Sequence, residues 1–465
     1  MKFNSFKKGI LFAAVLAMPL TACEDLLETE PRTALSPEVA LANVSGTEGI
    51  LVSVYNRLLA QGAYGNSLFI LPDISGDVFV QRPGASRGNA PYNLTPGGTL
   101  GYYPYSSINE ANYIIDGIGT LEAPQATKDR LLGSAYFLRA LNYFNAVRSY
   151  GYEPNKLVNG WDRGVIIRDK PTKGLTEADF RARGTVTEAY QLIESDLQQA
   201  ATLLAGNTNV YYASPAAANG LLARVYLYWE RWADAETRAT AAIGATSARL
   251  VTTAAAYEQA WSTSPNPESV FELNVNANTE SVGVNESMAS WVTPRQWGDF
   301  GINPELVALY PAGDHRLSLL KNGTVGGVSL DYLDKWNAHK GNYAQNLPIM
   351  RLPELYLIRA EARAEQNKIT EGLADLNALR AARGVPAVTA ANRQALIDAI
   401  LLERRLELAY EGHRFYDMKR RGMDIQRPSA IGANATLPYT DYRILAPWPQ
   451  SQVDLNPLLE QNPGY

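Results

Sequence analysis

The clearest hydrophobic pattern of the chain lies in the stretch TVTEAYQLIESDLQQAATLL, residues 185–204. Apolar side chains recur there every three or four positions, a spacing that places them on one face of an α-helix. Thr185 and Glu188 form a capping-box pattern at its start. The stretch therefore predicts an amphipathic helix whose buried face is made of Val186, Tyr190, Ile193, Leu197, Ala200 and Leu204.

Helical periodicity also runs through residues 105–118, 131–151, 214–243, 351–384 and 391–422. In the third of these stretches, Ser214 is a candidate cap and Pro215 suits the first helical position. Ala235 and Ala242 fall where a tetratricopeptide repeat places the small residues that let two antiparallel helices approach closely. The repeats are too degenerate for a regular solenoid. We therefore expect a mostly α fold, a tetratricopeptide-like scaffold of helical hairpins.

Two regions, residues 62–104 and 245–348, break the helical pattern. The first is rich in Gly, Pro, Asn and Ser, and the second contains short β-like runs such as SVFELNV and GGVSLDYL. Half of the eight tryptophans lie in the second region. Long irregular segments in a compact protein are usually functional, and their aromatic content argues against disorder. We expect both regions to form long irregular loops with minor β structure.

The N-terminus reads as a targeting segment. Three lysines within residues 1–8 precede an apolar run of 12 residues, which is too short to span a bilayer but typical of a signal peptide. The run ends in Leu-Thr-Ala before Cys23, the single cysteine of the chain, and resembles a bacterial lipobox. This predicts a lipoprotein signal peptide over 1–22, an acylated Cys23, and a leash over 23–45. The alternative is an ordinary secretory signal with an incidental cysteine.

Composition excludes several classes of site. Removal of residues 1–22, which carry three lysines and no acid, changes the formal charge from −5 to −8. An acidic chain with 19% charged residues has no electrostatic footprint for nucleic acid. With Cys23 acylated, no thiol is left for disulfides, cysteine nucleophiles or cysteine metal sites. The 26 tyrosines and eight tryptophans suit packing between helices and also suit stacking on sugar rings.

Motifs of catalysis are absent from the sequence: it contains no phosphate loop, dinucleotide fingerprint or G-x-S-x-G elbow. His315, His339 and His413 are far apart and lack metal-ligand spacing. Asp331 and Asp334 offer only a weak calcium motif. The charged stretch ERRLELAYEGHRFYDMKRRG, residues 403–422, could be an acid/base cluster, but each acid has an arginine at helical spacing. We interpret it as an ion-pair network that locks the last helices.

Eight pieces in order along the whole chain resemble the SusD-like (SusD/RagB) family of outer-membrane nutrient-binding lipoproteins. These pieces are CEDLLETEP, YSSINEAN, GSAYFLRALNYFNAVRSYG, RGTVTEAYQLIESDLQQA, NPELVALYPAGDHR, PIMRLPELYLIRAEA, LLERRLELAYEGHRFYDMKRRG and NPLLEQNPGY. Ser134 departs from the glutamate that is frequent there in the family, and we expect it to alter a local helix contact. The resemblance implies a single SusD-like α-helical domain over 46–465.

The resemblance also implies a function without catalysis and without a cofactor or metal. The family's partner is a SusC-like TonB-dependent outer-membrane transporter, which the lipid-anchored protein covers on the cell surface. Its usual cargo is oligosaccharide. On this basis, position and composition make the candidate ligand-binding residues Tyr102, Tyr103, Trp291, Arg295 and Trp297. The alternatives are a peptide cargo, a lipoprotein glycoside hydrolase, and a lid that binds only the transporter.

Overall fold

The structure of the chain is a computed structural model that describes residues 37–174, 176–427 and 436–465. Predictions about residues 1–36, including the signal peptide and Cys23, lie outside the described residues. The described part of the predicted leash 23–45 contains α2 (Pro37–Leu41) and the start of α3 at Val44.

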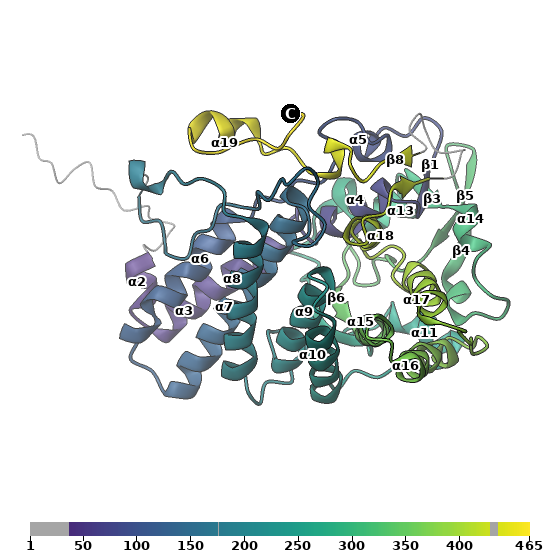
Figure 1. Cartoon of the computed structure of the whole chain (residues 1–465), viewed down its shortest axis with the longest axis horizontal. Coiled ribbons are helices and arrows are strands. Elements are labelled where there is room, and N and C mark those ends of the chain that lie inside the picture. Colours follow the sequence, from purple (N-terminus) through teal and green to yellow (C-terminus); the bar gives the residue numbers. More distant parts are fainter. Residues whose placement is uncertain (1–36, 175, 428–435) are drawn as a thin grey trace, which may run out of the picture.

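Long helices form the scaffold of the described chain. They are α3 (Val44–Leu58), α6 (Tyr105–Gly117), α7 (Gln125–Tyr150), α8 (Val186–Leu203), α9 (Pro215–Tyr228), α10 (Trp232–Ala245), α15 (Leu352–Glu365), α16 (Ile369–Ala382) and α17 (Arg393–Glu407). In Figure 1 they follow one another across the molecule, from α3 and α6 at one end, through α9 and α10, to α15–α17 at the other. Neighbours along this row pack as hairpins. The predicted mostly α scaffold of helical hairpins is confirmed.

Local sequence signals explain where several of these helices begin and how they pack. Thr185 caps α8 with the predicted capping box, and Ser214 caps α9 with Pro215 in its first turn. All six apolar residues of the predicted α8 face are buried. At Gly133 of α7, an added Cβ would lie 2.8 Å from the side chain of Leu204. Glycine therefore allows the end of α8 to lie directly against α7.

The two regions predicted to be irregular contain short elements that cluster on the right of Figure 1, together with loops. The short helices of the described chain are α4 (Ser67–Ser75), α5 (Asn89–Tyr92), α11 (Ala254–Ala260), α12 (Gly283–Glu286), α13 (Met288–Val292), α14 (Pro304–Val307), α18 (Arg414–Arg420) and α19 (Gln450–Leu455). Short 3₁₀ turns lie at η2 (Ile118–Thr120), η3 (Glu177–Asp179), η4 (His315–Leu319) and η5 (Tyr442–Ile444).

The described strands form antiparallel pairs. β1 (Phe79–Gln81) pairs with β3 (Phe300–Ile302), and β2 (Ser269–Leu273) with β6 (Leu347–Arg351). β4 (Leu320–Val325) pairs with β5 (Val328–Leu333), and β7 (Ile425–Gln426) with β8 (Thr436–Leu437). The predicted β-like runs correspond to β2 and β5. The first pair joins the two irregular regions to each other.

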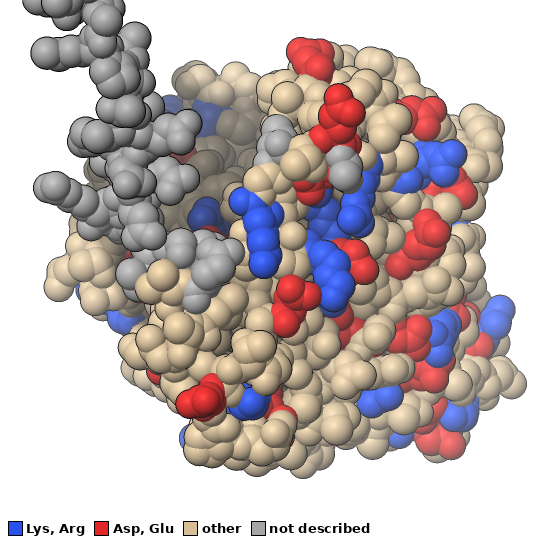
Figure 2. Space-filling model, turned by 90° about the vertical axis from the view of Figure 1, so that its left-hand side faces the viewer, with Lys and Arg blue, Asp and Glu red and all other residues tan. Residues whose placement is uncertain are grey.

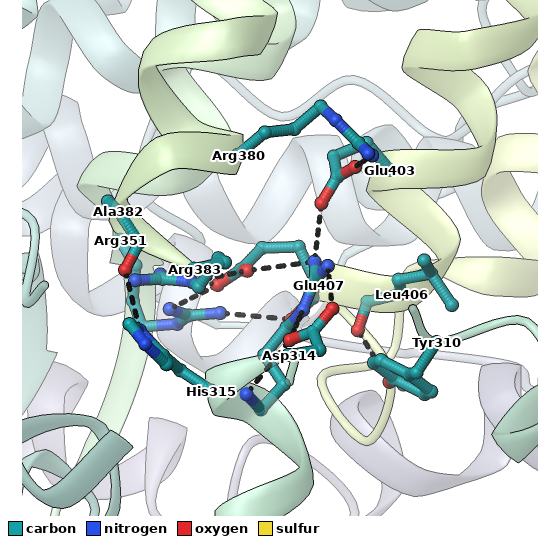
Figure 3. A network of polar contacts seen from close by, with 12 residues as sticks. Tyr310, Asp314, His315, Arg351, Arg380, Ala382, Arg383, Glu403, Leu406 and Glu407 are labelled. Carbon is teal, nitrogen blue, oxygen red and sulfur yellow. Dashed lines mark hydrogen bonds and ion pairs between the residues drawn. The ribbon is translucent and has the colours of Figure 1, made fainter. Parts of the chain in front are cut away.

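A buried ion-pair network holds α17 to the rest of the scaffold (Figure 3). Glu407 accepts hydrogen bonds from Arg383 Nε at 2.9 Å, from Arg351 Nη1 at 3.0 Å and from Arg316 Nη1 at 3.3 Å. These arginines come from the end of α16, the end of β6 and η4. All four side chains are at most 2% exposed. One carboxylate thus joins three elements.

The pKa values in this network show that it is structural. Burial alone would raise the pKa of Glu407, but the charges of Arg383 and Arg351 outweigh burial and hold it well below its usual range. The pKa values of Glu411 and Asp417 are likewise lowered, because the cations beside them outweigh burial. The acids are held ionised, whereas a general acid or base works best with a pKa near the operating pH. The predicted ion-pair network is confirmed.

Candidate functional site

Tyr102 and Tyr103, adjacent in sequence, lie in opposite environments. Tyr102 is buried, and its hydroxyl donates a hydrogen bond to Asn142 Oδ1 of α7 at 2.7 Å. Burial raises its pKa. Tyr103 is 38% exposed, and its hydroxyl donates to Gln452 Oε1 of α19 at 2.8 Å. Tyr102 is therefore part of the core, and Tyr103 is available to a ligand.

Tyr103 lines a hollow of about 280 Å³ on the molecular surface. Its ring centroid lies 4.7 Å from that of Tyr105 and 5.9 Å from that of Trp448, which itself stacks on Tyr150 at 4.4 Å. The aromatic wall is thus supported by packed rings behind it. The rest of the lining comes from α6, from the segment around residues 166–180, and from α19 and the residues after it.

The rim of this Tyr103 hollow carries amides, a hydroxyl and one cation. Asn109 is held by two bonds to Thr172, and Arg168 Nη1 donates to Thr172 Oγ1 at 3.2 Å. Ser106 and Asn109 also line a larger hollow of about 1080 Å³ between the described parts of α2, α3 and α6. The described residues that line the Tyr103 hollow include no Asp or Glu. Sequence analysis missed these rim residues, because they are brought together by the fold across as many as 349 positions.

Trp291 and Arg295 are engaged within the protein. Trp291 is 7% exposed, and its Nε1 donates to the Asn285 carbonyl at 2.9 Å. Arg295 forms a two-pronged ion pair with Asp334, at 2.6 and 3.0 Å. Asp334 is also one of the two acids of the weak calcium motif, and its carboxylate is engaged by Arg295. Both predicted residues thus have structural partners that a ligand would have to displace.

Trp297 is half-buried, with the Arg87 guanidinium 4.3 Å from its ring centroid. Arg87 also lies 3.5 Å from Asp299 Oδ2, and burial raises the pKa of Asp299 against the opposing charges of Arg87 and Arg82. Trp297 Nε1 is buried without a hydrogen-bond partner among the described residues. We call Trp297, Arg87, Arg82 and Asp299 the Trp297 patch. It combines a ring with polar groups, although arginine covers part of the ring.

The structure does not bring the five predicted residues into one site. Tyr103 precedes α6, and Trp291 and Trp297 belong to α13 and the loop after it. Figure 1 shows α6 and α13 in different parts of the molecule. The sequence therefore pointed to two separate places, of which the Tyr103 hollow is the better formed.

The histidines form no recognisable catalytic centre. His339 Nε2 lies 3.0 Å from Ser264 Oγ, and its Nδ1 lies 3.2 Å from Asn337 Oδ1. Ser264 and His339 are both exposed, and Asn337 also bonds to the Trp261 carbonyl and to Ser262. We interpret this contact as one that stabilises the surrounding turns.

The described residues offer no cluster of metal ligands, and the face shown in Figure 2 carries no basic stripe. Within the described residues, no group of three or more His, Cys, Asp or Glu side chains could hold a metal ion. On the face shown in Figure 2, basic and acidic side chains lie beside one another instead of forming a basic stripe. No helix in the described ranges is long and apolar enough to cross a membrane.

Comparison with known proteins gives consistent matches. The SusD family model matches residues 321–465, and a model described as starch-binding, associating with outer membrane, matches residues 89–227. A SusD-like protein of Formosa agariphila is 25% identical over an alignment 530 positions long, which covers 100% of both chains.

Solved structures share the fold over most of their length. A Bacteroides vulgatus protein provisionally described as sugar binding is 30% identical, with a TM-score of 0.81, 91% coverage of this chain and 98% of that chain. A laminarin-binding SusD-like protein is 22% identical with a TM-score of 0.71, covering 90% of this chain and 99% of that one, and supports the fold alone. Together with the family models and the full-length relative, these similarities establish that the chain belongs to the SusD family.

Proposed function

We propose that this SusD-family protein binds oligosaccharides at the cell surface and delivers them to a SusC-like TonB-dependent transporter in the outer membrane. Two comparisons support the ligand class: the matched model described as starch-binding and the relative provisionally described as sugar binding. The description of that model also names the outer membrane. The transporter partnership rests on the resemblance to the family.

The observation that carries the proposal is the exposed ring of Tyr103 at the wall of a polar-rimmed hollow. An aromatic ring offers a flat apolar face to the C–H groups of a sugar, while hydroxyl groups need hydrogen-bond partners. The side chains of Ser106, Arg168 and Gln452 supply donors and acceptors at the rim. Tyr105 and Trp448 hold the wall in place, so little side-chain entropy is lost when a ligand binds.

The same hollow favours binding over cleavage. A glycoside hydrolase needs two carboxyl groups about 5–10 Å apart across the scissile bond. The described lining of the Tyr103 hollow supplies none. A peptide cargo remains the alternative, and the binding experiment below distinguishes it from a glycan.

Attachment to the membrane is proposed to occur through acyl chains on Cys23, because the cysteine directly follows the apolar segment and small residues of a lipobox. Buried acyl chains contribute about 0.8 kcal/mol per CH₂, so several chains attach a protein durably. Growth of producing cells with a labelled fatty acid should label the wild-type chain and not Cys23→Ser. Equal labelling of both forms would contradict the lipid anchor.

Isothermal titration calorimetry with a panel of oligosaccharides and peptides tests the ligand and its site. We expect an oligosaccharide to bind the wild type and to bind Tyr103→Ala about tenfold more weakly, because a well-stacked ring contributes roughly 1.4 kcal/mol. Tyr103→Phe keeps the ring and is the matched control, with affinity close to that of the wild type.

Other outcomes would redirect the proposal. Loss of binding in Trp297→Ala, with Tyr103→Ala unchanged, would move the site to the Trp297 patch. Binding of peptides and of no oligosaccharide would replace glycan with peptide as the cargo.

A further inference from the structure

A second exposed aromatic ring lies far along the chain from Tyr103. Tyr212, in the loop between α8 and α9, is 51% exposed. It lies between two neighbouring hollows of about 300 and 430 Å³, and Val52, Tyr55 and Tyr212 line both of them. Each volume falls at or above the lower end of the ~300–1,000 Å³ range of small-molecule sites. Tyr212 therefore forms a ridge between two spaces of ligand size.

The loop that carries Tyr212 is held at several points. The Tyr55 ring meets the Tyr212 ring edge to face, with centroids 5.8 Å apart, and the Tyr55 hydroxyl accepts a hydrogen bond from the Ala213 N–H at 2.9 Å. The Val210 carbonyl accepts a bond from the Glu272 N–H of β2 at 2.9 Å. Because these bonds fix the loop, the ridge is preorganised and binding would cost little conformational entropy.

Amide side chains surround the ridge on both sides. Asn56, Asn274 and Asn276 line one hollow, and Asn207 and Asn209 line the other. Each amide carries donor and acceptor groups, of which Asn207 Nδ2 already donates to the Ala213 carbonyl at 2.7 Å. Asn207 and Asn209 also accept backbone bonds within the loop, from Asn209 N at 3.1 Å and from Tyr211 N at 3.0 Å respectively, which fixes their positions.

Three charged side chains also line the two hollows. Glu280 belongs to one hollow, and the exposed Arg130–Glu48 ion pair to the other. Ser134 adds a small buried side chain beside that pair. Because amides outnumber charged side chains in this lining and an exposed ring lies among them, the surface matches a polyhydroxylated ligand better than a strongly ionic one.

We propose that the Tyr212 ridge is a second oligosaccharide-binding site, in which consecutive sugar units occupy the two hollows and one of them stacks on the Tyr212 ring. The ligand class rests on the proposed function, whereas the site shares no lining residue with the Tyr103 hollow. Two separate sites on one molecule would let it hold a long glycan chain at two points and raise its avidity.

Affinity electrophoresis in gels containing starch, laminarin, mannan, xylan or pectin tests this inference. The chains compared are the wild type, Tyr212→Ala, Tyr103→Ala/Trp297→Ala, and the triple variant. We expect at least one polysaccharide to retard the double variant, and Tyr212→Ala to weaken that residual binding about tenfold. Tyr212→Phe, which keeps the ring, should bind like its parent. Thermal unfolding checks that each variant is folded. We expect Tyr212→Ala to fold, because the side chain of Tyr212 is half exposed.

The outcomes separate the two proposals. If Tyr212→Ala changes the mobility of neither the wild type nor the double variant, the second site is overturned and the proposed function stands. Complete loss of retardation in the double variant would do the same. A wild-type chain that none of the five polysaccharides retards would overturn both.

Discussion

Single residues carry the pH response of the fold, and the turn after α17 shows how. Burial lowers the pKa of His413 to about 4, although Glu354 opposes this. Burial raises the pKa of Asp73 to about 7, although the backbone N–H groups of Arg414 and Gly412 bond to its carboxylate. These two groups flank one turn and respond to pH in opposite directions.

The sign of each contribution follows from proton binding. Between pH 6.5 and 4 the unfolded chain protonates His413 and the folded chain does not, so acidification destabilises the fold. Between pH 7 and 3.8 the folded chain protonates Asp73 and the unfolded chain does not, so acidification stabilises it. The two contributions largely offset each other.

Replacing His413 should expose this balance. In His413→Gln the destabilisation that acidification causes through His413 is absent, so the stability of the variant relative to the wild type should rise by about 3 kcal/mol from pH 7 to pH 4. Urea unfolding of both proteins across that pH range measures the difference. Parallel stability profiles would show that His413 is not held neutral in the fold.

At the scale of single residues, the sequence identified candidate aromatic residues but did not predict the direction of their side chains. Tyr102 and Tyr103 were both predicted as ligand-binding residues, and the structure leaves only Tyr103 exposed. Nothing in the sequence indicated that Tyr102 faces Asn142 inside the fold while Tyr103 faces outward. That choice depends on α7 and α19, which are distant in sequence.

At the scale of elements, local signals predicted the helices and where they begin. The sequence did not predict which charged side chains pair across different elements. In the structure these charges fall on two helices: Arg404 of α17 pairs with Asp417 of α18 at 3.0 Å, and Asp417 pairs with Arg420, three residues further along α18, at 2.8 Å. Glu407, however, finds its partners on β6, α16 and η4. Spacing along one helix predicts only pairs within that helix. The pairs of Glu407 join elements that are distant in sequence, so they form only when the whole chain folds.

Removal of the Glu407 carboxylate should therefore be costly. Glu407→Ala removes the carboxylate that Arg316, Arg351 and Arg383 share and leaves these buried cations with fewer acids, and breaking a buried pair destabilises by about 3–5 kcal/mol. Glu110→Ala, which breaks the partly exposed pair with Arg57, is the matched control, and its loss should stay within about 1 kcal/mol. Urea unfolding at pH 7 compares the two. Equal losses would contradict a central role for the buried network.

At the scale of the whole molecule, the fold closes by bringing the C-terminal segment onto α7. Trp448 stacks on Tyr150, the Ala446 N–H donates to the Ser149 carbonyl at 2.9 Å, and the Asn462 side chain donates to the Tyr150 carbonyl at 3.0 Å. This closure places α19 at the top of Figure 1 and completes the wall of the Tyr103 hollow. The terminal motif NPLLEQNPGY thus contributes to the fold at the candidate site.

The central claim is that the protein carries glycans, and the most direct measurement is mass spectrometry of what co-purifies with the full chain from native outer membranes. The account predicts oligosaccharide ions together with a TonB-dependent transporter, and a marked loss of the oligosaccharide from Tyr103→Ala/Tyr212→Ala. Recovery of peptides in place of sugars, or of the transporter with no oligosaccharide from the wild type, would contradict it.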